Sequence, residues 1–168
     1  QRRARSLDDL GNVAHDQGDF PRAVELHNQA YEVAKAAGDR RFMASARANL
    51  GSAYFLQGDI ARARDEWQGV LDSNTIDDPV SRAMVMNNLA AASLQLNELD
   101  RARAILEEAL VIHQELGTLT TRADVFINLS DVAFRQGDPE RARVLFDQGI
   151  ELYRLAEDPK GLHNAYFN

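Results

Sequence analysis

The sequence contains no cysteine, no long apolar run and little lysine. Without cysteine the chain forms no disulfide bond and offers no thiol for catalysis or metal binding. No stretch of about 18 or more apolar residues is present, so we expect no membrane-spanning helix. Only Lys35 and Lys160 are lysines among the 19 basic residues, and the net charge is −7. A chain of this charge, without clustered Lys and Arg, is not expected to bind nucleic acid directly.

Sequence patterns of catalysis are also missing. The chain has no glycine-rich phosphate loop, no His-Glu-x-x-His motif and no Gly-x-Ser-x-Gly motif. Its four histidines lie far apart in the sequence, so their spacing does not indicate a metal site. We therefore expect a protein that is not an enzyme and that holds neither a metal nor a cofactor.

The composition is that of a folded, globular chain. Hydrophobic residues make up 45% and charged residues 27%, a balance unlike that of disordered chains. With 168 residues the chain is long enough for one domain with its own core. No charged-then-apolar leader is visible, and we expect a cytoplasmic location. Because the first residue is Gln1 rather than Met, we expect a processed product or an excerpt of a longer protein.

A pattern of about 40 residues recurs along the chain. Its fullest copy reads Leu-Gly-Ser-Ala-Tyr at 50–54, Gly-Asp at 58–59 and Ala-Arg-Asp-Glu-Trp at 63–67. The first leucine of the pattern recurs at positions 10, 50, 89 and 129. A fixed period in this range is typical of stacked-repeat proteins, in which each repeat contacts mainly its neighbours.

The residues of this pattern resemble the tetratricopeptide repeat, a helix–turn–helix unit. The resemblance rests on Leu-Gly-x-x-Tyr followed by Ala-x-x-x-Trp, and four copies cover nearly the whole chain. The period is longer than the usual one of about 34 residues, which predicts that the two helices of a repeat are together nearly two turns longer. The resemblance implies an all-α, right-handed α-solenoid of about four helix hairpins and the start of a fifth.

Glycine, aspartate and proline mark the ends of the predicted helices. Pairs such as Gly18-Asp19 and Gly58-Asp59 predict the end of one helix and the N-cap of the next. Residues 72–79 are the most turn-like stretch, and we expect a loop there. The predicted helices span residues 2–17, 20–37, 40–57, 60 to about 71, 79–96, 99–116, 120–136, 139–156 and 159 onward.

These helices predict a single repeat domain over residues 1–168. Its repeats are expected at about residues 2–38, 39–78, 79–118 and 119–158, with a partial repeat at 159–168. The next repeat leucine is due directly after Asn168, so we expect a fragment of a longer solenoid. Four alanines at one register are expected at close helix–helix contacts: Ala23, Ala63, Ala102 and Ala142.

One position of the repeat is polar in every copy. The residue just before each repeat leucine is Asp9, Asn49, Asn88, Asn128 or Asn168. Asparagine has middling-to-poor helix propensity, so its recurrence needs a cause. In tetratricopeptide proteins the inner helices line a concave groove, and asparagines in this register resemble those that hold the backbone of an extended peptide there. The alternative is that each asparagine bonds to a neighbouring repeat and keeps the stack in register; the two explanations are compatible.

Helical geometry adds groove candidates three or four residues from these asparagines, with Asn12 beside Asp9. They are Asn12, Ser45, Ser52, Met84, Ala91, Asp124 and Asp131. Phe55, Leu94 and Phe134 follow one turn later and fit either an apolar anchor for a ligand or the helix–helix core. Arg135 and Gln95 are candidates for contacts with polar side chains. We expect the partner-binding set to comprise Asp9, Asn12, Asn49, Ser52, Asn88, Asn128, Asp131 and Arg135.

Other polar residues favour structural roles. His27 stands where the other repeats carry large apolar side chains, which predicts a packed core histidine rather than a ligand. His15, a lone histidine late in the first helix, is expected to face solvent. Asp8 and Asp9 are adjacent and diverge by about 100° on a helix, so we expect two solvated charges rather than an acid–base pair.

The period and the motifs Asn-Leu-Gly, Gln-Gly-Asp and Arg-Ala-Arg resemble the repeat arrays of large bacterial regulators. These include LuxR-like, maltose-activator-like and antibiotic-regulatory-protein-like transcription activators. The resemblance implies a module that binds a protein or peptide in its groove and serves as the regulatory or sensor part of a transcriptional regulator. Similar long repeats occur in kinesin light chains and spindle-orienting scaffolds. The alternative is therefore an effector-binding or self-associating scaffold of a signalling protein, with homo-oligomers formed through the repeat ends.

Overall fold

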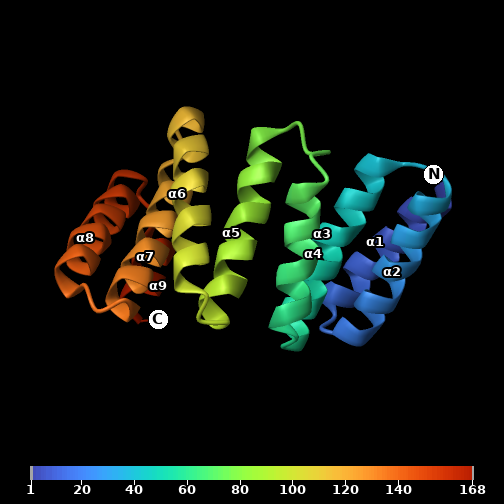
Figure 1. Cartoon of the computed structure of the whole chain (residues 1–168), viewed down its shortest axis with the longest axis horizontal. Helices are drawn as coiled ribbons and strands as arrows, with labels where there is room; N and C mark the ends of the chain where they lie inside the picture. The colour runs from blue at the N-terminus through green and yellow to red at the C-terminus, as the bar shows by residue number, and fades with distance from the viewer. Residues whose placement is uncertain (1, 168) are drawn as a thin grey trace. The chain divides into compact units, whose positions relative to one another are not determined.

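The computed structural model describes residues 2–167, and these residues are helical except for short connections. Within them nine helices form and no strand does (Figure 1). The helices are α1 (Arg2–Asp16), α2 (Phe20–Ala36), α3 (Arg40–Gln57), α4 (Ile60–Asp72), α5 (Pro79–Gln95), α6 (Leu99–Leu116), α7 (Leu119–Arg135), α8 (Pro139–Leu155) and α9 (Pro159–Phe167). The all-α fold is confirmed, and the helices begin and end at or next to the predicted residues.

Aspartate side chains begin most of the helices. At Asp19, Asp39, Asp59 and Asp138 the carboxylate accepts a hydrogen bond of 3.0–3.2 Å from the backbone N–H three residues later. The preceding helix ends on a residue in the left-handed region, as at Gly58 with φ of 90°. Asn97 takes that conformation with φ of 58°, as its place in the repeat predicted. Local capping chemistry therefore explains why the helix boundaries were predictable.

The chain divides into two compact units, Gln1–Ala92 and Ser93–Asn168. In the first unit, α1 packs on α2, α2 on α3 and α3 on α4. In the second unit, α6 packs on α7, α7 on α8 and α8 on α9. Helix α5 begins in the first unit and ends in the second. Within each unit these helices thus pack mainly on their neighbours in sequence, as in a solenoid of helix hairpins.

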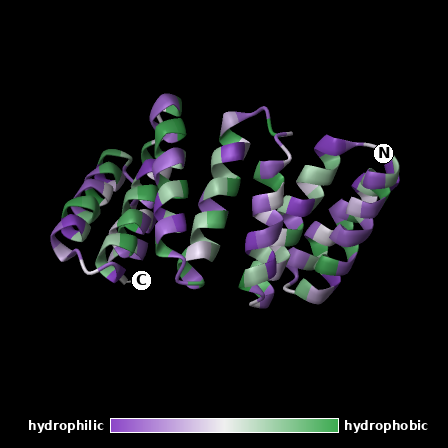
Figure 2. Ribbon diagram, viewed as in Figure 1, coloured by the Kyte–Doolittle hydropathy of each residue, from purple (hydrophilic) through white to green (hydrophobic). Residues whose placement is uncertain are grey.

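Small residues allow close packing between the helices. Ala23, Ala63 and Ala102 are fully buried, as their register predicted. The repeat leucines are buried at 50, 89 and 129, whereas Leu10 is 54% exposed on α1. Figure 2 shows hydrophobic residues recurring along the helices between hydrophilic ones. No helix among residues 2–167 combines the length and the apolar character that a bilayer crossing requires.

The glycine after the repeat leucine lies against a large ring from the second helix of the same hairpin. A Cβ atom on Gly51 would lie 2.5 Å from Nε1 of Trp67, so no larger residue fits there without a shift. The same indole nitrogen donates a hydrogen bond to the carbonyl of Ala48 over 3.1 Å. Gly11 and His27 repeat the arrangement, with 2.6 Å between a Gly11 Cβ and the ring. Close approach, rather than backbone freedom, accounts for these two glycines.

Candidate functional site

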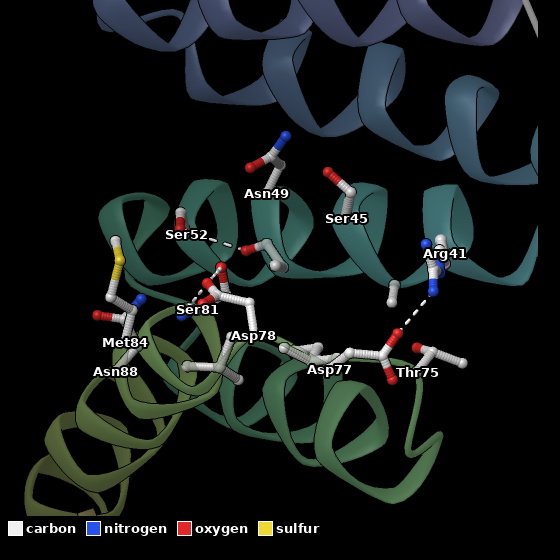
Figure 3. Close-up of a pocket in the computed structure, with 14 residues that line it drawn as sticks. Arg41, Ser45, Asn49, Ser52, Thr75, Asp77, Asp78, Ser81, Met84 and Asn88 are labelled. Atoms are coloured by element: carbon white, nitrogen blue, oxygen red, sulfur yellow. Dashed lines mark hydrogen bonds and ion pairs between the residues drawn. The ribbon is translucent and has the colours of Figure 1, made fainter. Parts of the chain in front are cut away.

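A pocket of about 500 Å³ lies within the first unit, between α3, α5 and the loop 73–78 (Figure 3). Cavities of this size are in the range that ligands occupy in proteins. Its polar lining from the helices comes from Arg41, Ser45, Asn49, Ser52, Ser81 and Asn88. Three of the expected partner-binding residues, Asn49, Ser52 and Asn88, line this pocket together. The sequence therefore predicted part of the helical lining. Ser45 and Met84, expected from the same helix faces, also line the pocket.

The loop between α4 and α5 forms the wall that sequence reasoning missed. Thr75, Ile76, Asp77 and Asp78 all line the pocket. Nη2 of Arg41 on α3 lies 2.6 Å from Oδ2 of Asp77, and this ion pair joins the loop to the helix (Figure 3). Both side chains are exposed, at 81% and 74%. No motif links two residues that lie 36 positions apart, so the sequence predicted the loop but not its place in the site.

Asp78 is the N-cap of α5 and the other carboxylate of this wall. It accepts hydrogen bonds from the Ser81 hydroxyl over 2.6 Å and from the Ser81 backbone N–H over 2.9 Å. These bonds, led by the one from the hydroxyl, lower the pKa of Asp78 below its ordinary value. The pocket therefore carries a carboxylate that stays ionised at neutral pH.

Asn49 takes part in a buried network that connects three helices. Its Nδ2 donates to Oδ1 and Oδ2 of Asp8 on α1, over 3.1 and 3.2 Å. Nδ1 of His27 on α2 lies 2.7 Å from Oδ1 of Asp8. Asp8 is 7% exposed and His27 is 1% exposed, which confirms the packed histidine. The expected solvation of Asp8 is wrong, because its face of α1 packs against α2 and α3; Asp9 is exposed as expected.

The other repeat asparagines differ from Asn49. Neither Asn88 nor Asn128 makes a side-chain hydrogen bond to any residue that the structure describes. Ala48 stands in the register of Asp8 one repeat later, so Asn88 is offered no carboxylate of that kind. Among the three described repeat asparagines, the bond to a neighbouring repeat thus explains only Asn49, and the amide of Asn88 lies exposed at the pocket. Asn168 lies outside the described residues.

The remaining predicted residues do not line this pocket. Asp9 and Asn12 are exposed on α1. Asp131 and Arg135 belong to the second unit, where their side chains form an ion pair of 2.9 Å. Nη1 of Arg135 also donates to the carbonyl of Leu94 over 3.1 Å. These contacts give Arg135 a structural explanation that its sequence position did not reveal.

A smaller cavity of about 270 Å³ adjoins the pocket through Ser52 and Asn88, which line both. His15, Phe55 and Trp67 are among its other lining residues. The His15 side chain is 31% exposed and its ring forms a T-shaped pair with the Phe20 ring, so the expectation that it faces solvent is only partly correct. Phe55 packs on Trp67 with ring centroids 5.7 Å apart. Of its register mates, Leu94 is buried and Phe134 is 69% exposed.

A separate polar cluster is found in the second unit. The hydroxyl of Tyr153 on α8 donates to Asp124 on α7 over 2.5 Å, and burial is the main cause that raises the pKa of Tyr153. Burial also lowers the pKa of His113 on α6, while the nearby Asp124 carboxylate opposes that shift. The hydroxyls of Thr118 and Thr121 each lie 3.2 Å from Nδ1 of His113. Within residues 2–167 no group of three or more His, Cys, Asp or Glu side chains could hold a metal ion.

Comparison with known proteins matches the chain to a family model and to a curated protein. The family model described as Tetratricopeptide repeat matches residues 2–66 and 81–154. Regulatory protein AfsR of Streptomyces griseus is 31% identical over 146 residues, which is 86% of this chain but only 15% of that protein. This chain therefore spans a small part of its curated relative.

Solved structures show the same fold. A chain described as kinesin light chain from Podosopora anserina has a TM-score of 0.81 and 20% identity, over 98% of this chain and 85% of its own. A Rap protein complexed with Competence and Sporulation Factor has a TM-score of 0.80 and 14% identity, over 98% of this chain and 46% of its own. The fold of stacked hairpins and the match to the family model agree: the chain belongs to the tetratricopeptide repeat family.

Proposed function

We propose that the chain binds an extended segment of a partner protein in the pocket between α3, α5 and the loop 73–78. The single observation that carries this proposal is the exposed amide of Asn88, which lines the pocket and makes no hydrogen bond within residues 2–167. One amide side chain offers both a donor and an acceptor, so it can pair with a peptide unit of any sequence. Tetratricopeptide repeats are typically non-catalytic scaffolds for protein interactions, and a binding role without enzymatic activity agrees with that.

The chain resembles part of a much longer regulatory protein, and we propose that it is the sensor or regulatory part of a bacterial transcriptional regulator. In this role the hairpins of both units act as one repeat domain in the cytoplasm and bind neither nucleic acid nor membranes. The Rap protein of the same fold is complexed with Competence and Sporulation Factor, which supports the use of such hairpins for binding another molecule.

The proposal is tested with fluorescent pools of degenerate hexapeptides whose ends are acetylated and amidated. Binding to the purified chain is measured by fluorescence anisotropy. Asn88→Ala should weaken binding by about tenfold, the loss of one or two hydrogen bonds, with an unchanged thermal midpoint. Asn164→Ala, at an exposed asparagine of α9 in the second unit, is the matched control and should bind as the parent chain does.

Three outcomes are distinguishable. Loss of binding in Asn88→Ala alone supports the pocket. Peptide binding that Asn88→Ala leaves unchanged contradicts the pocket as the site. No binding by any pool, together with thermal stabilisation by a small molecule, contradicts a peptide ligand and favours an effector-binding module.

A further inference from the structure

We infer that the pocket between α3, α5 and the loop 73–78 selects a segment that places a lysine or arginine side chain in it. The inference rests on the proposed function and makes it more specific. Its basis is the direction of the hydrogen bonds around the pocket. Four of the lining side chains, those of Asn49, Ser52, Thr75 and Ser81, already donate polar hydrogens within the protein and present acceptors to a ligand.

Two serine hydroxyls illustrate this most simply. Ser52 donates to the carbonyl of Ala48 in the preceding turn over 3.3 Å. Ser81 donates to Oδ2 of Asp78 over 2.6 Å. A hydroxyl carries one hydrogen and two lone pairs. Both serines line the pocket, and each therefore offers a ligand only an acceptor.

The hydroxyl hydrogen of Thr75 is also donated within the protein, to its loop neighbour Ser73. Ser73 donates its hydroxyl hydrogen to the carbonyl of Val70 over 2.6 Å. The hydroxyls of Ser73 and Thr75 are 2.7 Å apart. Because the only hydroxyl hydrogen of Ser73 is used, Thr75 must donate in this second bond. Thr75 lines the pocket, and it too is left with lone pairs.

The amide of Asn49 is oriented by a charge. A carboxylate only accepts hydrogen bonds, so the Asn49 NH₂ group must face Asp8. The carbonyl oxygen of that amide has no partner in the described part of the chain. Asn49 therefore adds another acceptor to the lining, and its orientation cannot reverse without losing the bonds to Asp8.

The charges of the lining agree with its hydrogen bonds. Among the described residues, Arg41 is the only cation that lines the pocket, and it is paired with Asp77. Asp78 forms no ion pair with any described residue, so the lining retains one net negative charge. Lysine and arginine side chains donate hydrogen bonds and accept none, and charged donors form the stronger bonds. A carboxylate in the same place would be repelled by the charge of Asp78.

The apolar part of the lining fits the rest of such a side chain. Ala44, Ile76 and Val85 contribute apolar surface to the pocket. Lysine and arginine bury their aliphatic stems against surface of this kind while the charged end contacts polar groups. Asn88, whose amide keeps both its donors and its acceptor, remains available to the backbone of the segment.

The test uses hexapeptide pools that differ only at one central residue, which is Lys, Arg, Gln, Met or Glu, with acetylated and amidated ends. Fluorescence anisotropy measures their binding to the intact chain. The Lys and Arg pools should bind about tenfold more tightly than the Glu pool, and the difference should shrink as salt is added. Asp78→Asn should reduce the preference to less than about threefold while it preserves the helix cap, since Asn caps as well as Asp.

Asp138→Asn is the matched control, because Asp138 caps α8 in the second unit with the same geometry. It should leave the preference for cationic pools unchanged. A free lysine derivative, Nα-acetyl-lysine amide, distinguishes a peptide side chain from a small amine. If it binds as tightly as the Lys pool, the occupant is a small amine and the inference of a segment is overturned.

Failure of the inference and failure of the proposed function give different results. Pools that bind in an Asn88-dependent manner, without preference for Lys and Arg, overturn the inference and leave the proposed function standing. A preference for the Glu pool overturns it as well. An absence of binding by every pool contradicts both.

Discussion

Asn49 on α3 donates to both carboxylate oxygens of Asp8 on α1, over 3.1 and 3.2 Å, although 41 residues separate them. Asp8 in turn lies 2.7 Å from Nδ1 of His27 on α2. The first hairpin and the first helix of the second are therefore joined through one nearly buried carboxylate. A carboxylate in such a position is tolerated because its hydrogen bonds are made.

Replacing Asn49 should therefore destabilise the fold, whereas replacing Asn88 should not. Asn49→Ala removes the amide from Asp8 and should lower the free energy of unfolding by about 1–3 kcal/mol. Asn88→Ala removes an exposed amide without partners among residues 2–167 and should change it by less than about 0.5 kcal/mol. Urea unfolding followed by circular dichroism measures both. Equal effects of the two substitutions would contradict the stabilising role of the bond between Asn49 and Asp8.

The contact between Gly51 and Trp67 predicts that the effect of Gly51→Ala on stability depends on the size of residue 67. Gly51→Ala improves helix propensity by about 1 kcal/mol but places a Cβ atom 2.5 Å from the indole ring. We expect a net loss of about 1–3 kcal/mol, as for other overpacked sites. The double variant Gly51→Ala with Trp67→Leu follows the pairing of Ala90 and Leu106 in the sequence register.

Thermal unfolding of both single variants and the double variant completes a double-mutant cycle. The double variant should be more stable than the sum of the two single losses predicts. Additive losses would mean that the ring does not restrict residue 51.

Ala63 predicts a second overpacking effect at the helix contacts. Its side chain is fully buried on α4, so Ala63→Leu should lower the free energy of unfolding by about 1–3 kcal/mol. Ala61 is exposed on the same helix and provides the control, because Ala61→Leu adds the same atoms without a packing conflict. Thermal melts that show no difference between these two variants would contradict the packing of α4.

His113 predicts a dependence of stability on pH. Burial lowers its pKa in the folded chain, with Asp124 opposing the shift, whereas the unfolded chain binds a proton near pH 6.5. Between these two pKa values the folded state therefore binds fewer protons than the unfolded state. The contribution of His113 to the free energy of unfolding is fully present above about pH 6.5, and it is lost as the pH falls through the lowered pKa of the folded state.

The thermal midpoint should accordingly drop more between about pH 7.5 and pH 5.5 in the parent chain than in His113→Leu. The difference between the two proteins isolates His113 from the carboxylates that titrate in both. An identical drop in the two proteins would indicate that protonation of His113 is not linked to unfolding.

The sequence predicted the elements well because their signals are local. A glycine or asparagine in the left-handed region followed by an aspartate N-cap lies within two residues, as at Gly58-Asp59. The 40-residue period then predicted which helix faces share a register. Ser45, Asn49 and Ser52 on α3 could therefore be placed on one wall with Met84 and Asn88 on α5.

Contacts that depend on a particular pair of distant residues were not predictable in this way. Which of Asp8 and Asp9 is buried depends on α3, far along the chain. The Arg41–Asp77 ion pair has no local signal at all. The distinction between Asn49 and Asn88 did have one, since Asp8 is replaced by Ala48 in the next repeat. Comparing the residues opposite a repeated position, in addition to the position itself, would have revealed it.

One wall of the pocket belongs to a loop of six residues, 73–78, that lies outside the helical repeat. Loops tolerate substitution and changes of length better than the packed helices they connect. Because the helices carry the packing and the loop carries Asp77 and Asp78, we expect substitutions in the loop to alter the proposed ligand preference while the packing of the helices stays constant. To change the proposed binding preference, one would therefore exchange the six residues of the loop 73–78 and keep all nine of the described helices.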